Sequence, residues 1–133
     1  MRVKRTAMII IAATLTSGAL HAETPKALKC QFPKGVTYDG GKLEEDAQKD
    51  FSLIFDSIDL TKGTARLIGN IGASDVVVIA NASTLNFIEV TPVGYLNVTT
   101  LFHLPEMPAV HSRHVVIIDE PMPSQRYGTC KPF

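Results

Sequence analysis

The chain has 133 residues, 13 basic and 13 acidic side chains, and only two cysteines. A chain of this length builds one domain with one core and is too short for two. It contains no run of basic residues that could follow a phosphate backbone, so we do not expect nucleic acid as a partner.

Residues 1–22 have the pattern of a secretory signal peptide. Basic residues precede a short apolar stretch, and small residues lie just before Ala22. The apolar stretch is shorter than the roughly 20 residues that a membrane-spanning helix needs. We therefore expect a mature domain of residues 23–133 that is periplasmic or secreted and does not span the membrane.

The two cysteines lie near the two ends of this mature domain, at Cys30 and Cys130. In an oxidising compartment an even number of cysteines indicates disulfide pairing. No C-x-x-C motif is present, so a redox site is not indicated. The sequence predicts one disulfide that ties the N- and C-terminal ends of the domain together.

Between the cysteines the sequence predicts short β-strands separated by glycine- or proline-containing turns. Phe51, Leu53 and Phe55 share one strand face, and Gly63 can supply the positive φ of the following turn. Residues 94–104 alternate between two faces with the period of two that a half-buried strand shows. The predicted strands are residues 51–58, 64–69, 74–80, 84–91, 94–104 and 109–119.

These strands predict an all-β fold, a single antiparallel meander that closes into a small barrel or a sandwich. Closure is expected because open sheet edges invite aggregation. The polar residues 40–50 are expected to form a solvated loop. The proline-containing residues 120–130 are expected to cross the surface and bring Cys130 to Cys30.

The segment "AVHSRH" (109–114) is the most distinctive polar feature. On a strand, His111 and Arg113 point one way, and Ser112 and His114 point the other. The two histidines therefore cannot share one metal ion without a bulge, and neither cysteine is left over as a ligand, so no metal is predicted. No G-x-S-x-G elbow is present for a serine hydrolase, and no catalytic residue or cofactor is assigned.

Whichever face of this strand turns inward, it carries polar groups that must find partners. Either they form an internal network with a carboxylate, for which Glu89 and Asp56 are the candidates, or they line a ligand cavity. We expect one pair, His111 with Arg113 or Ser112 with His114, to be largely buried. Arg113 is the expected anchor, because a guanidinium can bind one carboxylate at two points.

Three sequence motifs in combination resemble a group of small secreted bacterial proteins of unknown function. They are FIE-x-T-x-x-G-x-x-x-x-TT from Phe87 to Thr100, HSRH at 111–114, and SQ-x-YG-x-C at 124–130. The resemblance covers most of the mature chain. It implies a secreted one-domain protein and carries no activity over.

Two functions are compatible with these features. The first is a non-enzymatic binding protein that holds a small apolar or amphipathic ligand or docks an envelope protein. The alternative is a secreted inhibitor of a hydrolase such as lysozyme, although the Ser-Gly-x-x-Tyr loop of one such inhibitor group is missing. An enzyme that uses His111, Arg113, His114 or Ser124 is the weakest hypothesis, because strand alternation separates these groups.

Overall fold

The structure, a computed structural model, describes residues 23–133, and the predicted signal peptide lies outside this range. Every regular element in it is a β-strand, and the part described contains no helix that is long and apolar enough to cross a membrane. The strands are β1 (Leu28–Asp39), β2 (Lys42–Glu45), β3 (Phe51–Asp59), β4 (Thr64–Gly69), β5 (Gly72–Ala80), β6 (Thr84–Val90), β7 (Leu96–Phe102), β8 (Pro108–His114), β9 (Val116–Ile117), β10 (Glu120–Pro121) and β11 (Ser124–Pro132).

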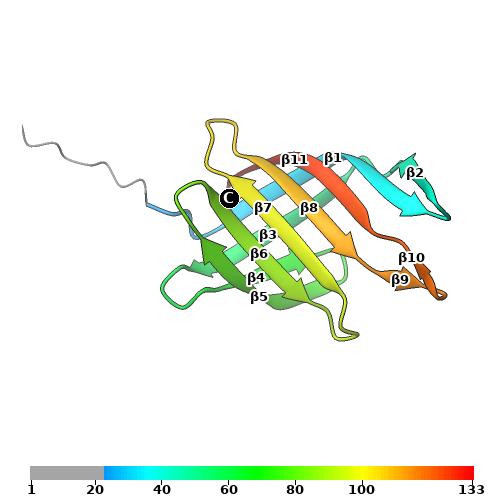
Figure 1. The fold of residues 1–133 in the computed structure, drawn as a ribbon. Coiled ribbons are helices and arrows are strands. Elements are labelled where there is room, and N and C mark those ends of the chain that lie inside the picture. Colours follow the sequence, from blue (N-terminus) through cyan, green and yellow to red (C-terminus); the bar gives the residue numbers. More distant parts are fainter. Residues whose placement is uncertain (1–22) are drawn as a thin grey trace, which may run out of the picture.

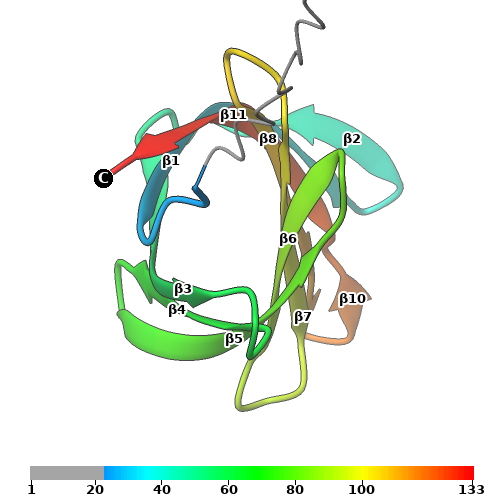
Figure 2. The same cartoon turned by 90° about the vertical axis from the view of Figure 1, so that its left-hand side faces the viewer.

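Eight strands form a closed antiparallel barrel in the order β11-β8-β7-β6-β5-β4-β3-β1, and β1 pairs with β11 to complete the ring. Figure 2 looks along the barrel and shows this ring. The predicted meander is therefore confirmed, and the choice between a barrel and a sandwich is decided for the barrel. Closure satisfies the backbone groups that an open edge would leave unpaired.

Two segments predicted as loops take part in strand pairing. Within residues 40–50, β2 extends the outer half of β1 as a hairpin. Residues 124–132 form β11, which pairs with both β1 and β8 instead of crossing the surface. The alternation of β11 was not visible in the sequence, because its inward positions are Arg126, Gly128 and Cys130, of which two are not apolar side chains.

The predicted strand 109–119 is also shorter than expected. It ends at His114, and β9 and β10 form a separate small hairpin between β8 and β11. Figure 1 shows this hairpin extending from the same end of the barrel as the β1–β2 hairpin. The tip of the β9–β10 hairpin is Ile118 and Asp119, both with positive φ.

The seam between β1 and β11 depends on one glycine and on the disulfide. A Cβ atom added at Gly128 would lie 1.8 Å from the carbonyl oxygen of Gln31, where β1 changes its register between Gln31 and Lys34. No side chain fits at that distance, so only glycine allows the two strands to approach. Cys30 and Cys130 lie opposite each other in the same strand pair and form the predicted disulfide.

The core fills the end of the barrel near the disulfide. The rings of Phe55 and Phe87 stack with their centroids 3.9 Å apart, and the smaller aliphatic side chains of neighbouring strands pack around them. Leu53 and Phe55 face inward as their alternation predicted. At the other end of the barrel, β6 and β8 end and β3 and β7 begin. This apolar core does not extend to that end, where the inward side chains are of a different kind.

Candidate functional site

A cavity of about 510 Å³ opens at this second end of the barrel, which we call the mouth. Its apolar wall includes Phe51, Leu53 and Leu67, from β3 and β4. Polar side chains line the opposite wall and the rim. These are Ser74, Glu89, Asn97, His111 and Arg113, from β5, β6, β7 and β8.

His111 lies deep in this end of the barrel and is only 3% exposed. Its Nδ1 atom lies 2.8 Å from the hydroxyl of Thr99, which β7 places directly opposite. The rings of Phe51 and Phe32 pack against the imidazole, with centroids 5.3 and 5.8 Å away.

Burial lowers the pKa of His111 to about 4, and the charges of Arg113 and Arg126 act in the same direction while that of Glu89 opposes them. A charged imidazole is disfavoured where water is excluded. His111 is therefore neutral at pH 7. One neutral ring nitrogen carries the proton and the other accepts, so the contact with Thr99 can run in either direction.

Glu89 and Asn97 face each other across the β6–β7 pair and form the polar centre of the cavity wall. The Oε1 atom of Glu89 accepts a 2.6 Å hydrogen bond from the hydroxyl of Ser74. Its Oε2 atom accepts a 2.7 Å hydrogen bond from the side-chain amide of Asn97. The Oδ1 atom of Asn97 is buried and has no partner in the described part of the chain.

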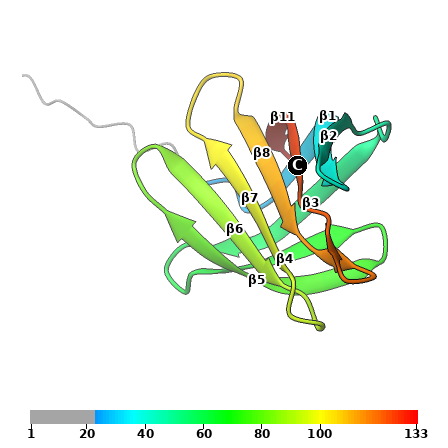
Figure 3. The same cartoon turned by 45° about the vertical axis from the view of Figure 1, so that its right-hand side comes forward.

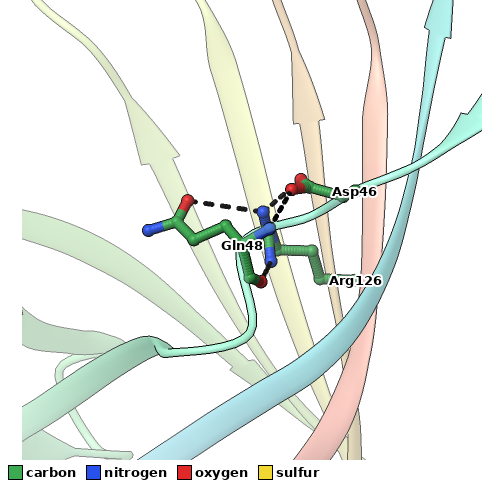
Figure 4. A network of polar contacts seen from close by, with 3 residues as sticks. All are labelled: Asp46, Gln48 and Arg126. Carbon is green, nitrogen blue, oxygen red and sulfur yellow. Dashed lines mark hydrogen bonds and ion pairs between the residues drawn. The ribbon is translucent and has the colours of Figure 1, made fainter.

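Arg126 is the buried arginine of the barrel, and it closes the side of the mouth where β11 meets β1. Its side chain is 4% exposed and forms an ion pair with Asp46 in the loop between β2 and β3. It also donates a 2.8 Å hydrogen bond to the backbone carbonyl of Gln48, as Figure 4 shows. The guanidinium lies over the ring of Phe51 at 4.7 Å, so one residue holds both the loop and the aromatic wall.

Strand alternation places His111 and Arg113 on one face and Ser112 and His114 on the other, as predicted. The expectation that Arg113 is buried and anchors a carboxylate is wrong. His111 turns inward, whereas Arg113 lies exposed at the rim and forms no ion pair within residues 23–133. Strand β8 ends at His114, so the side chain of Arg113 reaches the open end of the barrel. Ser112 faces outward and accepts a hydrogen bond from Gln125, and His114 is exposed.

The two candidate carboxylates also separate. Glu89 lies in the mouth together with His111. Asp56 lies on the outer surface and accepts two hydrogen bonds from Arg66, which hold the pKa of its carboxyl below the usual range. Asp56 is therefore not part of the cavity.

Sequence reasoning missed Arg126, Asp46, Ser74 and Asn97. The nearest signal was the alternation of β7, which groups Asn97 with Thr99 on one face. Nothing in the sequence indicated that Arg126 and Asp46, 80 residues apart, would meet.

Within residues 23–133 no three histidine, cysteine or carboxylate side chains gather closely enough to hold a metal ion. Comparison of the chain with protein-family models, with curated proteins and with solved structures gives no significant match. The resemblance to small secreted bacterial proteins therefore stays a prediction.

Proposed function

We propose that this protein is a non-enzymatic binding protein that holds a small amphipathic ligand in the mouth cavity. The observation that carries the proposal is the composition of the cavity. Aromatic and aliphatic side chains form one wall, and a few polar groups converge on the other, with the buried Oδ1 atom of Asn97 unpaired. Ligand sites in proteins are mostly apolar pockets with a few placed polar groups.

The surroundings of His111 favour a structural role over catalysis. A general base needs a nearby nucleophile that can reach the substrate. The hydroxyl nearest to His111 belongs to Thr99, which is 2% exposed and does not line the cavity. The Thr99–His111 hydrogen bond is thus a buried structural contact next to the cavity, and it provides no accessible nucleophile.

We propose further that the protein acts in the periplasm or outside the cell. The disulfide between Cys30 and Cys130 supports this location, because such bonds persist in oxidising compartments.

The cavity can be tested with Nile red, an uncharged dye whose fluorescence rises in apolar surroundings. A Cβ atom at Gly69 would meet only Leu53 at 3.9 Å, and the φ of Gly69 suits any residue, so Gly69→Leu should fill the cavity without strain. The matched control is Thr64→Leu, which adds the same side chain to the exposed face of the same strand.

We expect saturable Nile red binding by the parent protein and by Thr64→Leu, and at least a tenfold weaker affinity for Gly69→Leu. Melting temperatures would verify that both variants are folded. Equal binding by all three proteins, or no binding by the parent, would contradict a ligand site in the mouth.

The alternative function, inhibition of a hydrolase, is favoured by a different observation at the same end. Ile118 is 91% exposed at the tip of the β9–β10 hairpin and has a φ of 50°, a conformation that β-branched residues rarely adopt. Residues 39–50 carry five carboxylates and two lysines. An apolar tip beside acidic loops suits a basic partner such as a lysozyme.

For this alternative, the turnover of a basic lysozyme would be measured with increasing amounts of the protein. Inhibition that is relieved by Ile118→Asp would support the alternative function. Full lysozyme activity at a tenfold molar excess of the protein would reject it.

A further inference from the structure

We infer that the polar group of the ligand is a protonated amine. This inference rests on the proposed function and names the chemical class that the mouth cavity would take. Its basis is an anionic side chain and an unpaired acceptor that adjoin each other in the cavity wall, Glu89 and Asn97.

The carboxylate of Glu89 is partly buried and has no cationic partner among residues 23–133. Its two hydrogen-bond donors, Ser74 and Asn97, are both neutral. Neutral donors orient a carboxylate but leave its charge uncompensated, and each carboxylate oxygen can accept more than one hydrogen bond. A buried charge is costly unless it is paired, so this carboxylate is ready to receive a cation.

The side chain of Asn97 adds an acceptor at the same place. The contact with Glu89 fixes the orientation of the amide, because a flipped amide would place its oxygen against the carboxylate. The Oδ1 atom is then an acceptor, and it is buried without a donor. An unpaired buried acceptor is destabilising, so a donor from the ligand would be favoured at this atom.

An ammonium group matches both features. It carries one positive charge and three N–H donors, enough to bind Glu89 and the Oδ1 atom of Asn97 together. The apolar side chains of Phe51, Leu53 and Leu67 are available for its alkyl or aryl body. The acidic residues of 39–50 would also raise the local concentration of a cation at the mouth.

Arg113 lies at the rim of the same cavity and carries a charge opposite to that of Glu89. The two residues therefore predict opposite ligand preferences, which an experiment can distinguish. If Arg113 selected the ligand, an anion would bind best. Glu89 is less exposed than Arg113 and is fixed by two hydrogen bonds, whereas Arg113 is exposed. The partly buried and fixed charge of Glu89 should therefore dominate the selection, since solvent screens the exposed charge of Arg113 more strongly.

The experiment compares three probes with the same eight-carbon chain, n-octylamine, n-octanol and n-octanoate, at neutral pH by displacement of Nile red from the folded protein. We expect n-octylamine to bind at least tenfold more tightly than n-octanol, and n-octanoate to bind most weakly. Glu89→Gln keeps the shape of the side chain and removes its charge, so it should abolish the preference for the amine and leave n-octanol within about twofold. Glu106→Gln, the matched control, makes the same substitution in the exposed β7–β8 loop at the opposite end of the barrel and should leave the preference intact.

Equal affinities for the three probes, or tightest binding of n-octanoate with loss in Arg113→Gln, would overturn the inference. If Glu89→Gln does not fold, the three probes on the parent protein still decide. Binding of Nile red without a preference for the amine would contradict this inference alone, whereas absence of Nile red binding would contradict the proposed function itself.

Discussion

The two ends of the barrel interior are built from different kinds of side chain. Toward the disulfide, the inward positions of β5 to β8 are apolar, and toward the mouth the same strands become polar. The pairs of inward residues that mark this change are Val76 and Ser74, Phe87 and Glu89, Leu101 and Asn97, and Ala109 and His111. Figure 3 shows these strands side by side along the barrel wall.

The connections at the two ends differ in charge as well. At the mouth, residues 39–50 have an excess of three carboxylates, and Asp119 and Glu120 add two more. At the opposite end, the β3–β4 turn pairs Asp59 with Lys62, the β5–β6 turn carries no charge, and the β7–β8 loop carries one carboxylate, Glu106. The apolar end therefore stabilises the barrel, and the polar end is where we propose that the ligand binds.

Reduction of the disulfide should have the largest effect on stability, because it acts on the apolar end that holds the ring closed. The bond closes a separation of 100 residues. In the chain-entropy account such a loop contributes about 4–5 kcal/mol to the free energy of unfolding, an upper-end value. Urea unfolding with and without a reductant measures it. A midpoint that does not move on reduction would show that the strand pairing alone holds the seam.

Arg126→Ala should destabilise the fold by about 2–3 kcal/mol, because it removes a buried cation and leaves Asp46 without its partner. The loop between β2 and β3 also loses its hydrogen bond from Arg126 to the carbonyl of Gln48. Denaturant unfolding gives the change. Asp46→Asn is the companion variant, and a loss in both single variants that does not add in the double variant would identify the pair as one unit.

The burial of His111 should make the mouth sensitive to acid. Its pKa in the folded state is about 4, below the ordinary value of 6.5, so the unfolded chain binds the proton more readily between these values. Its contribution is complete above about pH 6.5 and is lost as the pH falls toward 4. The loss between pH 7 and 4.5 is about 2 kcal/mol.

Unfolding of the parent protein and of His111→Gln at both pH values isolates this contribution, since glutamine keeps a polar side chain and does not titrate. The variant should lose about 2 kcal/mol less than the parent over this interval. An identical pH dependence of the two proteins would show that His111 is not the acid-sensitive group.

Arg113→Ala should have the smallest effect, within about 0.5 kcal/mol of the parent, because Arg113 is exposed and has no ion-pair partner in the described part of the chain. The contrast with Arg126→Ala sharpens the comparison, since both arginines lie at the mouth and only one is buried. A large loss in Arg113→Ala would mean that the rim contributes to stability as the interior does.

The sequence by itself determined much of the fold. The alternation of apolar residues identified β3 and β7, the turns marked the limits of β4, β5 and β6, and the short connections indicated an antiparallel meander. The two cysteines predicted the disulfide, because only one intramolecular pair is possible. Strand alternation and turns are local features of the sequence, and the disulfide follows from the number of cysteines. None of these predictions requires knowledge of the closed barrel.

Only the tertiary structure decided which face of β7 and which face of β8 turn inward. In β7 the more apolar face, with Leu96 and Phe102, lies outside, and Thr99 is buried together with Leu101. Hydrophobicity alone would choose the opposite orientation. The register with β6 and β8 overrides it, because a strand in a closed barrel must match its neighbours on both sides.

The site could not be read from the sequence for the same reason. His111 and Glu89 were among the candidates from the sequence. Their hydrogen-bond partners, Thr99 for His111 and Asn97 for Glu89, lie on neighbouring strands and were not predicted. The choice between Arg113 and Arg126 as the buried arginine depends on where β8 ends and where β11 turns inward. Alternation divides residues between two faces, and only the closed ring determines which face excludes water.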